Sequence, residues 1–349
     1  MLEEHSFQYS ESFSLESGES LPGFQLSYTT FGTLNAQQDN IIWVCHALTG
    51  NANVLDWWGG LFGEGRLYNP REFYVICVNM LGSCYGSTGP LSINPKTNQP
   101  FYHTFPALTN RDIVRSFDLL REHLGFKQLH TLIGGSLGGQ QALEWSIMVP
   151  SVAQHLIQVA SNAQHSPWGI AFNESQRMAI QSDASWSKDH PEAGLTGMRT
   201  ARSIALLSYR HYKTYQKTQE ETTADKLDHF RASSYQQYQG EKLARRFNAF
   251  SYWTLSKTMD SHHVGRQRGS IENALTEIRA KSLFVGIETD VLFPVSEQQF
   301  LADRVPGAHL ALIDSDYGHD GFLLEFEQLT HHILAFYRTA DRQQHSVAL

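Results

Sequence analysis

The sequence predicts an α/β fold, in which a mostly parallel sheet is covered by helices on both faces. Short β-branched and apolar runs alternate with helix-like segments in the first part of the chain, which is the pattern of a parallel sheet with crossover helices. A long polar stretch with helical periodicity then interrupts this alternation, before strand-like runs return. The composition, with 41% hydrophobic and 18% charged residues, is that of an ordinary globular protein. At 349 residues we expect one large domain with an insertion, or two domains.

The expected strands are short apolar runs, four of them early in the chain and two late. They cover residues 41–45, 74–78, 129–133, 155–159, 282–287 and 309–313. Between the second and third strands, residues 110–124 carry apolar side chains at helical spacing, which predicts a crossover helix. A last helix is expected over residues 323–337.

The polar stretch predicts how the chain divides. Residues 166–280 are rich in Gln, Ser, Tyr and Arg and contain no convincing strand. We therefore expect residues 1–165 and 281–349 to form the α/β core, with residues 166–280 inserted as a unit of helices.

Charge and cysteine content exclude several classes of partner. The net charge of -8, without any run of Lys and Arg longer than a pair, argues against nucleic acid. The N-terminus lacks a basic region followed by an apolar stretch, and no window approaches the ~18 apolar residues of a membrane span. Cys45, Cys77 and Cys84 are typical of small core residues in a reducing compartment. These features predict a cytoplasmic protein that does not bind a membrane.

A nucleophile is predicted where an apolar strand runs through G-x-S-x-G into a helix. The motif spans Gly134 to Gly138 and centres on Ser136. Such a sharp turn needs small neighbours, and it exposes the serine hydroxyl at its tip. The N–H of Leu137 then points toward a developing oxyanion, with the positive end of the helix behind it. Taken alone, the motif also suits a glycine-rich turn for phosphate binding or packing.

The remaining members of a catalytic triad follow in the order typical of the α/β-hydrolase fold, acid first and histidine second. Asp290 comes just after the strand at 282–287, and His319 just after the strand at 309–313. Carboxyl ends of parallel strands gather functional groups at one edge of a sheet. We therefore expect Ser136, Asp290 and His319 to form the triad.

Two other acids compete with Asp290. Glu288 comes earlier in the same loop, and Asp320 is adjacent to His319 and would project elsewhere. A surface-loop role is the alternative for His319 itself, because the chain has 17 histidines. Its place in the order favours catalysis.

The second oxyanion donor is expected in the loop after the first strand. Residues 46–50 occupy that place, and the N–H of Leu48 is the candidate, although Gly50 would equally suit a plain turn.

Cys84, in a glycine-rich turn, is an alternative nucleophile that lacks an evident basic partner. No metal is expected, because His5, His262 and His263 show no ligand spacing. No dinucleotide or Walker phosphate motif is present either.

Five blocks spread over nearly the whole chain form a pattern more specific than G-x-S-x-G. They are residues 46–50, 79–90, 134–145, 290–294 and 317–320. Together they resemble the homoserine O-acetyltransferase family of the α/β-hydrolase fold. The resemblance implies a ping-pong transfer in methionine biosynthesis, in which Ser136 accepts an acetyl group from acetyl-CoA as co-substrate and passes it to the hydroxyl of L-homoserine. It also implies no bound cofactor, a lid formed by the helical insertion, and a homodimer through the lid helices.

Substrate-binding residues are implied by the same resemblance. The segment 200–210 is similar to the family's lid motif, and Arg202 and Tyr209 lie seven residues apart, which places them on one helix face. Arg202 would bind the carboxylate of homoserine, and Asp320 its ammonium group. A structural salt bridge is the alternative for Arg202.

Other activities fit the same scaffold. A homoserine O-succinyltransferase or a serine O-acetyltransferase would differ only in pocket shape. A serine esterase would use the same triad with water as acceptor, and a noncatalytic binding protein could keep the fold.

Overall fold

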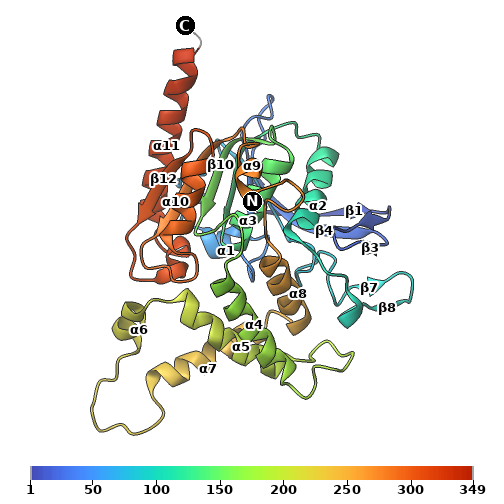
Figure 1. Ribbon diagram of the computed structural model, residues 1–349, viewed down its shortest axis with the longest axis vertical. Helices are drawn as coiled ribbons and strands as arrows, with labels where there is room; N and C mark the ends of the chain where they lie inside the picture. Colours follow the sequence, from blue (N-terminus) through green and yellow to red (C-terminus); the bar gives the residue numbers. More distant parts are fainter. Residues whose placement is uncertain (1, 348–349) are drawn as a thin grey trace.

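The structure is a computed structural model that describes residues 2–347, and it is built around one eight-stranded sheet (Figure 1). The strand order across the sheet is β1-β4-β6-β5-β9-β10-β11-β12. The strands are β1 (Glu3–Tyr9), β4 (Phe24–Gly32), β5 (Ile41–Cys45), β6 (Tyr74–Val78), β9 (Leu129–Gly135), β10 (Ala153–Val159), β11 (Lys281–Ile287) and β12 (His309–Ile313). Every strand from β6 to β12 in this order pairs in parallel with its neighbour, whereas β4 and β1 are antiparallel. The prediction of a mostly parallel α/β sheet is confirmed.

The two antiparallel strands at one edge are absent from the sequence prediction. In β1 only Phe7 is buried, so this edge strand has no apolar run to reveal it. In β4 the apolar residues Phe24, Leu26 and Tyr28 alternate with Gln25 and Ser27, and this period of two was available in the sequence. Both strands add to the sheet without changing the edge at which the site forms.

Helices cover both faces of the sheet, because its central strands are buried on both sides. In β5, Ile41, Trp43 and Cys45 face one hydrophobic cluster, and Ile42 and Val44 face the other. The first cluster lies under α2, α3 and α10, and the second under α1 and α11. These helices are α1 (Val54–Trp58), α2 (Asn110–His123), α3 (Leu137–Met148), α10 (Val295–Arg304) and α11 (Phe326–Val347).

The crossover helix α2 begins where its sequence provides a cap. The Thr109 hydroxyl accepts a hydrogen bond from the N–H of Asp112 at 3.2 Å, and the Asp112 carboxylate accepts one from the N–H of Thr109 at 3.0 Å. This capping box satisfies N–H groups that have no partner inside the helix. The predicted helix over 110–124 is therefore confirmed.

Residues 166–280 carry helices and no named strand. In Figure 1, α4 to α7 lie together below the sheet, and α8 lies between them and the core. The helices are α4 (Pro167–Gln181), α5 (Leu195–Tyr209), α6 (Tyr212–Gln219), α7 (Arg231–Ala244), α8 (Ala249–Asp260) and α9 (Ile271–Leu275). Buried side chains of α5 and α8, such as Met198 and Leu255, belong to the same hydrophobic cluster as α2 and α3. The division into core and lid stays a prediction.

Short elements complete the fold. They are β2 (Phe13–Ser14), β3 (Ser20–Leu21), β7 (Ile93–Asn94), β8 (Gln99–Pro100), and the 3₁₀ helices η1 (Tyr102–Thr104) and η2 (Gly318–Leu323). Among the helices within residues 2–347, none has the length and apolar character needed to cross a membrane.

Candidate active site

Ser136 lies at the turn between β9 and α3, in a backbone conformation that residues other than glycine rarely adopt. Its φ is 56° and its ψ is -126°. The turn is closed by two glycines. A Cβ on Gly134 would lie 2.3 Å from the carbonyl oxygen of Gly138, and a Cβ on Gly138 would lie 2.0 Å from the carbonyl oxygen of Cys45. The elbow is therefore packed backbone to backbone, which explains why the sequence needs glycine at these positions.

The three predicted triad residues meet at the carboxyl edge of the sheet. Ser136 follows β9, Asp290 follows β11, and His319 lies in η2 after β12. The distance from Ser136 Oγ to His319 Nε2 is 3.0 Å, and that from His319 Nδ1 to Asp290 Oδ2 is 2.7 Å. All three side chains are buried.

The structure also distinguishes Asp290 from its two competitors. Asp290 Oδ1 accepts hydrogen bonds from the N–H groups of Leu292 at 2.8 Å and Phe293 at 2.9 Å, which leaves Oδ2 for His319. Glu288 is exposed. With the carboxylate fixed in this way, Nδ1–H of His319 donates to Asp290, and Nε2 is free to accept the serine proton.

Aromatic rings enclose the imidazole of His319. Phe293 stacks on it with a centroid distance of 5.2 Å, Phe322 meets it edge-on at 5.3 Å, and Tyr209 lies at 5.7 Å. Neither Phe293 nor Phe322 was predicted from the sequence, although both lie close along the chain to a predicted triad residue. Their packing restricts the ring to the orientation that reaches both Ser136 and Asp290.

Ser136 and His319 open into a small cavity of about 80 Å³. Its lining residues come from the loop after β5, from α5 and from η2, and they are Ala47, Leu48, Thr49, Ser136, Arg202, Tyr209, His319, Asp320, Phe322 and Leu323. Leu48, the predicted oxyanion donor, is among them. Leu137 is the first residue of α3, so its N–H has no acceptor within the helix.

The predicted substrate residues lie in the same cavity. The guanidinium carbon of Arg202 lies 5.3 Å from the centroid of the Tyr209 ring, a cation–π contact. Among the described residues, no carboxylate lies within ion-pair distance of Arg202. Burial raises the pKa of the Tyr209 hydroxyl, so this tyrosine is neutral.

Asp320 already has a protein partner. Its Oδ2 lies 2.6 Å from Nε of Arg210, the residue directly after α5. Arg210 was not predicted from the sequence, although it belongs to the same segment as Arg202 and Tyr209. An ammonium group bound by Asp320 would therefore share this carboxylate with Arg210.

Other candidate groups lie elsewhere. Cys84 lines a different cavity, and burial raises the pKa of its thiol to about 11, which disfavours the thiolate nucleophile. His262 is buried, and its Nε2 lies 3.2 Å from the carbonyl oxygen of Asn162. Within residues 2–347, no group of three or more His, Cys, Asp and Glu side chains is placed to hold a metal ion.

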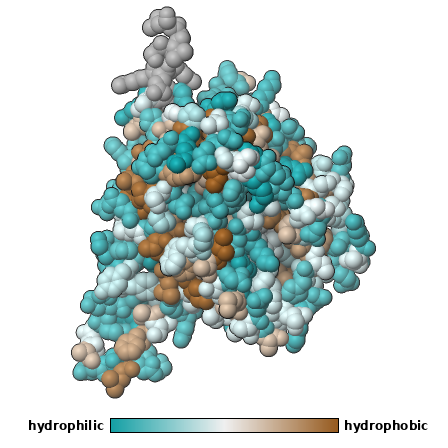
Figure 2. All heavy atoms as spheres, in the orientation of Figure 1, coloured by the Kyte–Doolittle hydropathy of each residue, from teal (hydrophilic) through white to brown (hydrophobic). Residues whose placement is uncertain are grey.

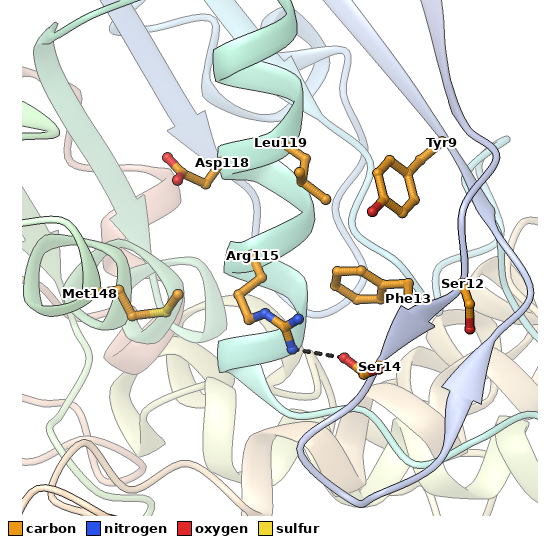
Figure 3. Close-up of a pocket in the computed structure, with 8 residues that line it drawn as sticks. All are labelled: Tyr9, Ser12, Phe13, Ser14, Arg115, Asp118, Leu119 and Met148. Carbon is orange, nitrogen blue, oxygen red and sulfur yellow. Dashed lines mark hydrogen bonds between the residues drawn. The ribbon is translucent and has the colours of Figure 1, made fainter.

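A larger cavity of about 310 Å³ lies between the N-terminal strands and α2 (Figure 3). Arg115 projects from α2 into this cavity and donates a hydrogen bond of 2.7 Å to the carbonyl oxygen of Ser14. Its guanidinium carbon also lies 4.8 Å from the Phe13 ring centroid. None of the triad residues lines this cavity, so its size does not make it the site of the chemistry.

Comparison with known proteins agrees with this geometry. The family model of the alpha/beta hydrolase fold matches residues 40–326. The homoserine O-acetyltransferase of Cyclobacterium marinum is 54% identical over 331 residues, which cover 95% of this chain and 94% of the relative. Among solved structures, the homoserine O-acetyltransferase of Bacillus anthracis superposes with a TM-score of 0.87 at 24% identity, covering 96% of this chain and 97% of that one. The acetyl esterase MekB superposes with a TM-score of 0.84 at 21% identity, covering 96% of each chain. Both superpositions show the fold, and the 54% identity shows the family: the chain belongs to the homoserine O-acetyltransferase family of α/β-hydrolase-fold proteins.

Proposed function

We propose that the protein transfers an acetyl group from acetyl-CoA to the side-chain hydroxyl of L-homoserine, a step toward methionine. The observation that carries this proposal is the 54% identity, over 95% of the chain, to a protein named homoserine O-acetyltransferase. The hydrogen-bonded Ser136, His319 and Asp290 support it, because Ser136 and His319 line a cavity that Arg202 also lines.

In the first half-reaction, Ser136 becomes acetylated. His319 Nε2 takes the proton from Ser136 Oγ while Oγ attacks the thioester carbonyl carbon. The N–H groups of Leu48 and Leu137 stabilise the oxyanion that forms. His319 then gives its proton to the CoA sulfur as the carbon–sulfur bond breaks, and Asp290 stabilises the transient imidazolium.

In the second half-reaction, the homoserine hydroxyl takes the place of the thiol. His319 removes the hydroxyl proton, the hydroxyl oxygen attacks the acetyl carbon, and the ester bond to Ser136 breaks as its oxygen regains the proton. The ping-pong order follows, because CoA must leave before the acceptor can reach the same carbonyl.

Recognition of the acceptor is assigned to the face of α5 that lines the cavity. Arg202 has no carboxylate partner among the described residues, so its guanidinium is available to the homoserine carboxylate. Asp320 would bind the ammonium group while keeping Arg210 as its second partner. Tyr209 packs between Arg202 and His319 and fixes their spacing.

Assembly and location belong to the same proposal. We assign the lid role to the helices of residues 166–280, and a homodimer interface to their outer surface. Six large apolar or aromatic side chains of this region are more than half exposed, namely Trp168, Met178, Leu207, Tyr212, Leu227 and Tyr238. Apolar surface is also visible in Figure 2 at the lower left, toward the insertion helices. The cysteines are free, which suits the cytoplasm. The molecular mass in solution tests the dimer.

The experiment that tests the function measures CoA release by the purified protein. Acetyl-CoA and succinyl-CoA are each combined with L-homoserine, L-serine or no acceptor. Fast release only with acetyl-CoA and homoserine is expected. Preference for another pair would change the substrate assignment, and release that does not depend on an acceptor would show a hydrolase.

A Ser136→Ala variant tests the mechanism in the same assay. It should release CoA at least about 10³-fold more slowly, because the nucleophile is gone. Mass spectrometry of the wild-type protein after acetyl-CoA addition should show one added acetyl group, and the variant should show none. Transfer that survives in the folded variant would overturn the acyl-serine mechanism.

A further inference from the structure

The candidate oxyanion donor Leu48 shares its peptide unit with the carbonyl of Ala47. The structure has no cis peptide bond among the described residues, so this C=O and this N–H point in opposite directions. Whatever holds the Ala47 carbonyl oxygen therefore sets the direction of the Leu48 N–H. The carbonyl oxygen accepts a hydrogen bond from the N–H of Gly50 at 2.8 Å, which closes the turn.

A side chain holds the same oxygen. Nδ1 of His46 lies 2.8 Å from the Ala47 carbonyl oxygen, and Nε2 of His46 lies 3.2 Å from the backbone N–H of Met80, which donates to it. Because Nε2 accepts, the ring proton must be on Nδ1, and Nδ1–H donates to the carbonyl. The imidazole is only 1% exposed, and burial lowers its pKa to about 4, so near pH 7 this neutral form persists.

We propose that His46 is a positioning residue for the reaction, which aims the Leu48 N–H at the oxyanion and strengthens it as a donor through the Ala47 carbonyl. A hydrogen bond to a peptide oxygen polarises the N–H of the same peptide. This inference rests on the proposed acyl-serine chemistry. It gives a role to the first residue of the block 46–50, which touches neither Ser136 nor the other triad residues in any hydrogen bond described.

Packing around His46 leaves little freedom for the loop. A Cβ on Gly50 would lie 3.1 Å from Cβ of His46, and a Cβ on Gly138 would lie 2.9 Å from the His46 carbonyl oxygen. The loop that carries Leu48 is thus held against the start of α3, where Leu137 supplies the other donor. Met80 fixes the far side of the ring.

Two substitutions separate the two hydrogen bonds of His46. In His46→Asn, the amide N–H stands where Nδ1–H stood and can still donate to the Ala47 carbonyl. In His46→Gln, the amide oxygen stands where Nε2 stood and can still accept from the Met80 N–H. A purely structural role would make the two variants equally impaired, or would favour Gln because Met80 keeps its partner.

The readout is acetylation of Ser136 by p-nitrophenyl acetate, followed as the burst of p-nitrophenolate, which needs neither CoA nor homoserine. His46→Asn should acetylate within about five-fold of the wild-type rate. His46→Gln should be slower by about 100-fold, comparable to removing one oxyanion donor, with a KM for the ester changed by less than about two-fold. Equal rates in the two variants, or a slower Asn variant, would overturn the proposal.

Two controls keep this test decisive. Thermal unfolding reports whether each variant folds. If the Gln variant does not fold, the Asn variant alone still tests the inference. A folded Asn variant in which Ser136 is acetylated more than ten-fold more slowly than in the wild type refutes it. The wild-type protein separates this inference from the proposed function. A wild type that acetylates from the ester but does not transfer to homoserine contradicts the function alone, whereas the absence of any burst contradicts both.

Discussion

At the level of single side chains, the residues of the site differ in how completely the protein satisfies them. Both oxygens of Asp290 are occupied, and His319 is held at both ring nitrogens. Arg202 contacts only an aromatic ring among the interactions described, although it lines the cavity. A side chain whose hydrogen-bonding groups are all paired holds a fixed orientation for the reaction. A charged side chain without a counter-ion is available to bind a ligand.

Arg202→Met should therefore affect the acceptor and spare the donor. We expect the KM for homoserine to rise about 10- to 100-fold, because the charge-assisted hydrogen bonds to its carboxylate are lost. The rate of Ser136 acetylation by acetyl-CoA should change little. Steady-state kinetics and single-turnover acetylation measure the two quantities.

Arg199→Met is the matched control. Arg199 lies on the same helix but pairs with Glu241 at 2.8 Å, on a half-exposed surface. The KM of this variant for homoserine should stay within about two-fold of the wild-type value, because exposed ion pairs contribute little to stability. If both variants raised KM alike, the helix and not the Arg202 guanidinium would be responsible.

The sequence predicted the triad residues because their order along the chain and their places after strands carry the information. Arg210 was missed as the partner of Asp320, because the two residues are more than a hundred positions apart and no local sequence pattern indicates that they pair. The same holds for His46, whose hydrogen bond to Met80 spans 34 positions. Pairs of this kind require the three-dimensional structure.

At the level of elements, the decisive contact is the approach of α3 to β5. The end of β5 and the first turn of α3 touch through backbone atoms at Gly138. This contact holds the loop that carries Leu48 beside the first turn of α3, where Leu137 lies.

Gly138→Ala should separate these elements. Its methyl group would lie 2.0 Å from the Cys45 carbonyl oxygen, so α3 must move. We expect the free energy of unfolding to fall by about 3 kcal/mol, and Ser136 acetylation to slow by at least about 100-fold. Urea unfolding and the ester burst measure these effects.

Gly125→Ala provides the comparison. Gly125 has φ of 74°, and a methyl group on it would meet nothing within 4 Å, so only backbone strain is added. The expected cost is about 1–2 kcal/mol, with acetylation within about two-fold of wild type. Equal losses in the two variants would mean that the contact with Cys45 is unimportant.

Element prediction succeeded where burial on both faces leaves an apolar run. The strands β5 and β6 have the predicted bounds, since each is a short apolar run whose residues are mostly buried. The edge strand β12 also has the predicted bounds, because four of its five residues are apolar, although only Ile313 is buried. The edge strand β1 was missed because solvent on its outer side permits polar residues at nearly every position. The helical character of residues 166–280 was predicted, but sequence periodicity does not specify how those helices pack on α2 and α3.

Across the whole molecule, buried histidines link stability to pH. Burial lowers the pKa of His46 and His165 to about 4 and that of His262 to about 3. In the unfolded chain these groups take up protons near their ordinary value of about 6.5. These histidines therefore do not lower the free energy of unfolding above about pH 6.5. They lower it progressively as the pH falls from 6.5 toward the folded pKa values.

The His262→Gln variant tests how much the protonation of one of these histidines contributes to the pH dependence of stability. The Gln amide can still donate to the Asn162 carbonyl that His262 Nε2 contacts. Around pH 5, the slope of unfolding free energy against pH should be smaller in the variant by about 1 kcal/mol per pH unit. All other titrating groups are shared, so the difference isolates this histidine. Identical slopes would contradict the lowered pKa.

The position of His319 far downstream of Ser136 has a consequence for synthesis. Ser136 and His319, its proposed base, are 183 residues apart. At about 5–20 residues per second, roughly 10–40 s pass between their emergence from the ribosome. During that interval the nascent chain displays a serine without its base, and η2 is added only after β11 and β12 complete the sheet. Under the proposed mechanism, thioester cleavage thus begins only after His319 has been made and η2 has joined the sheet.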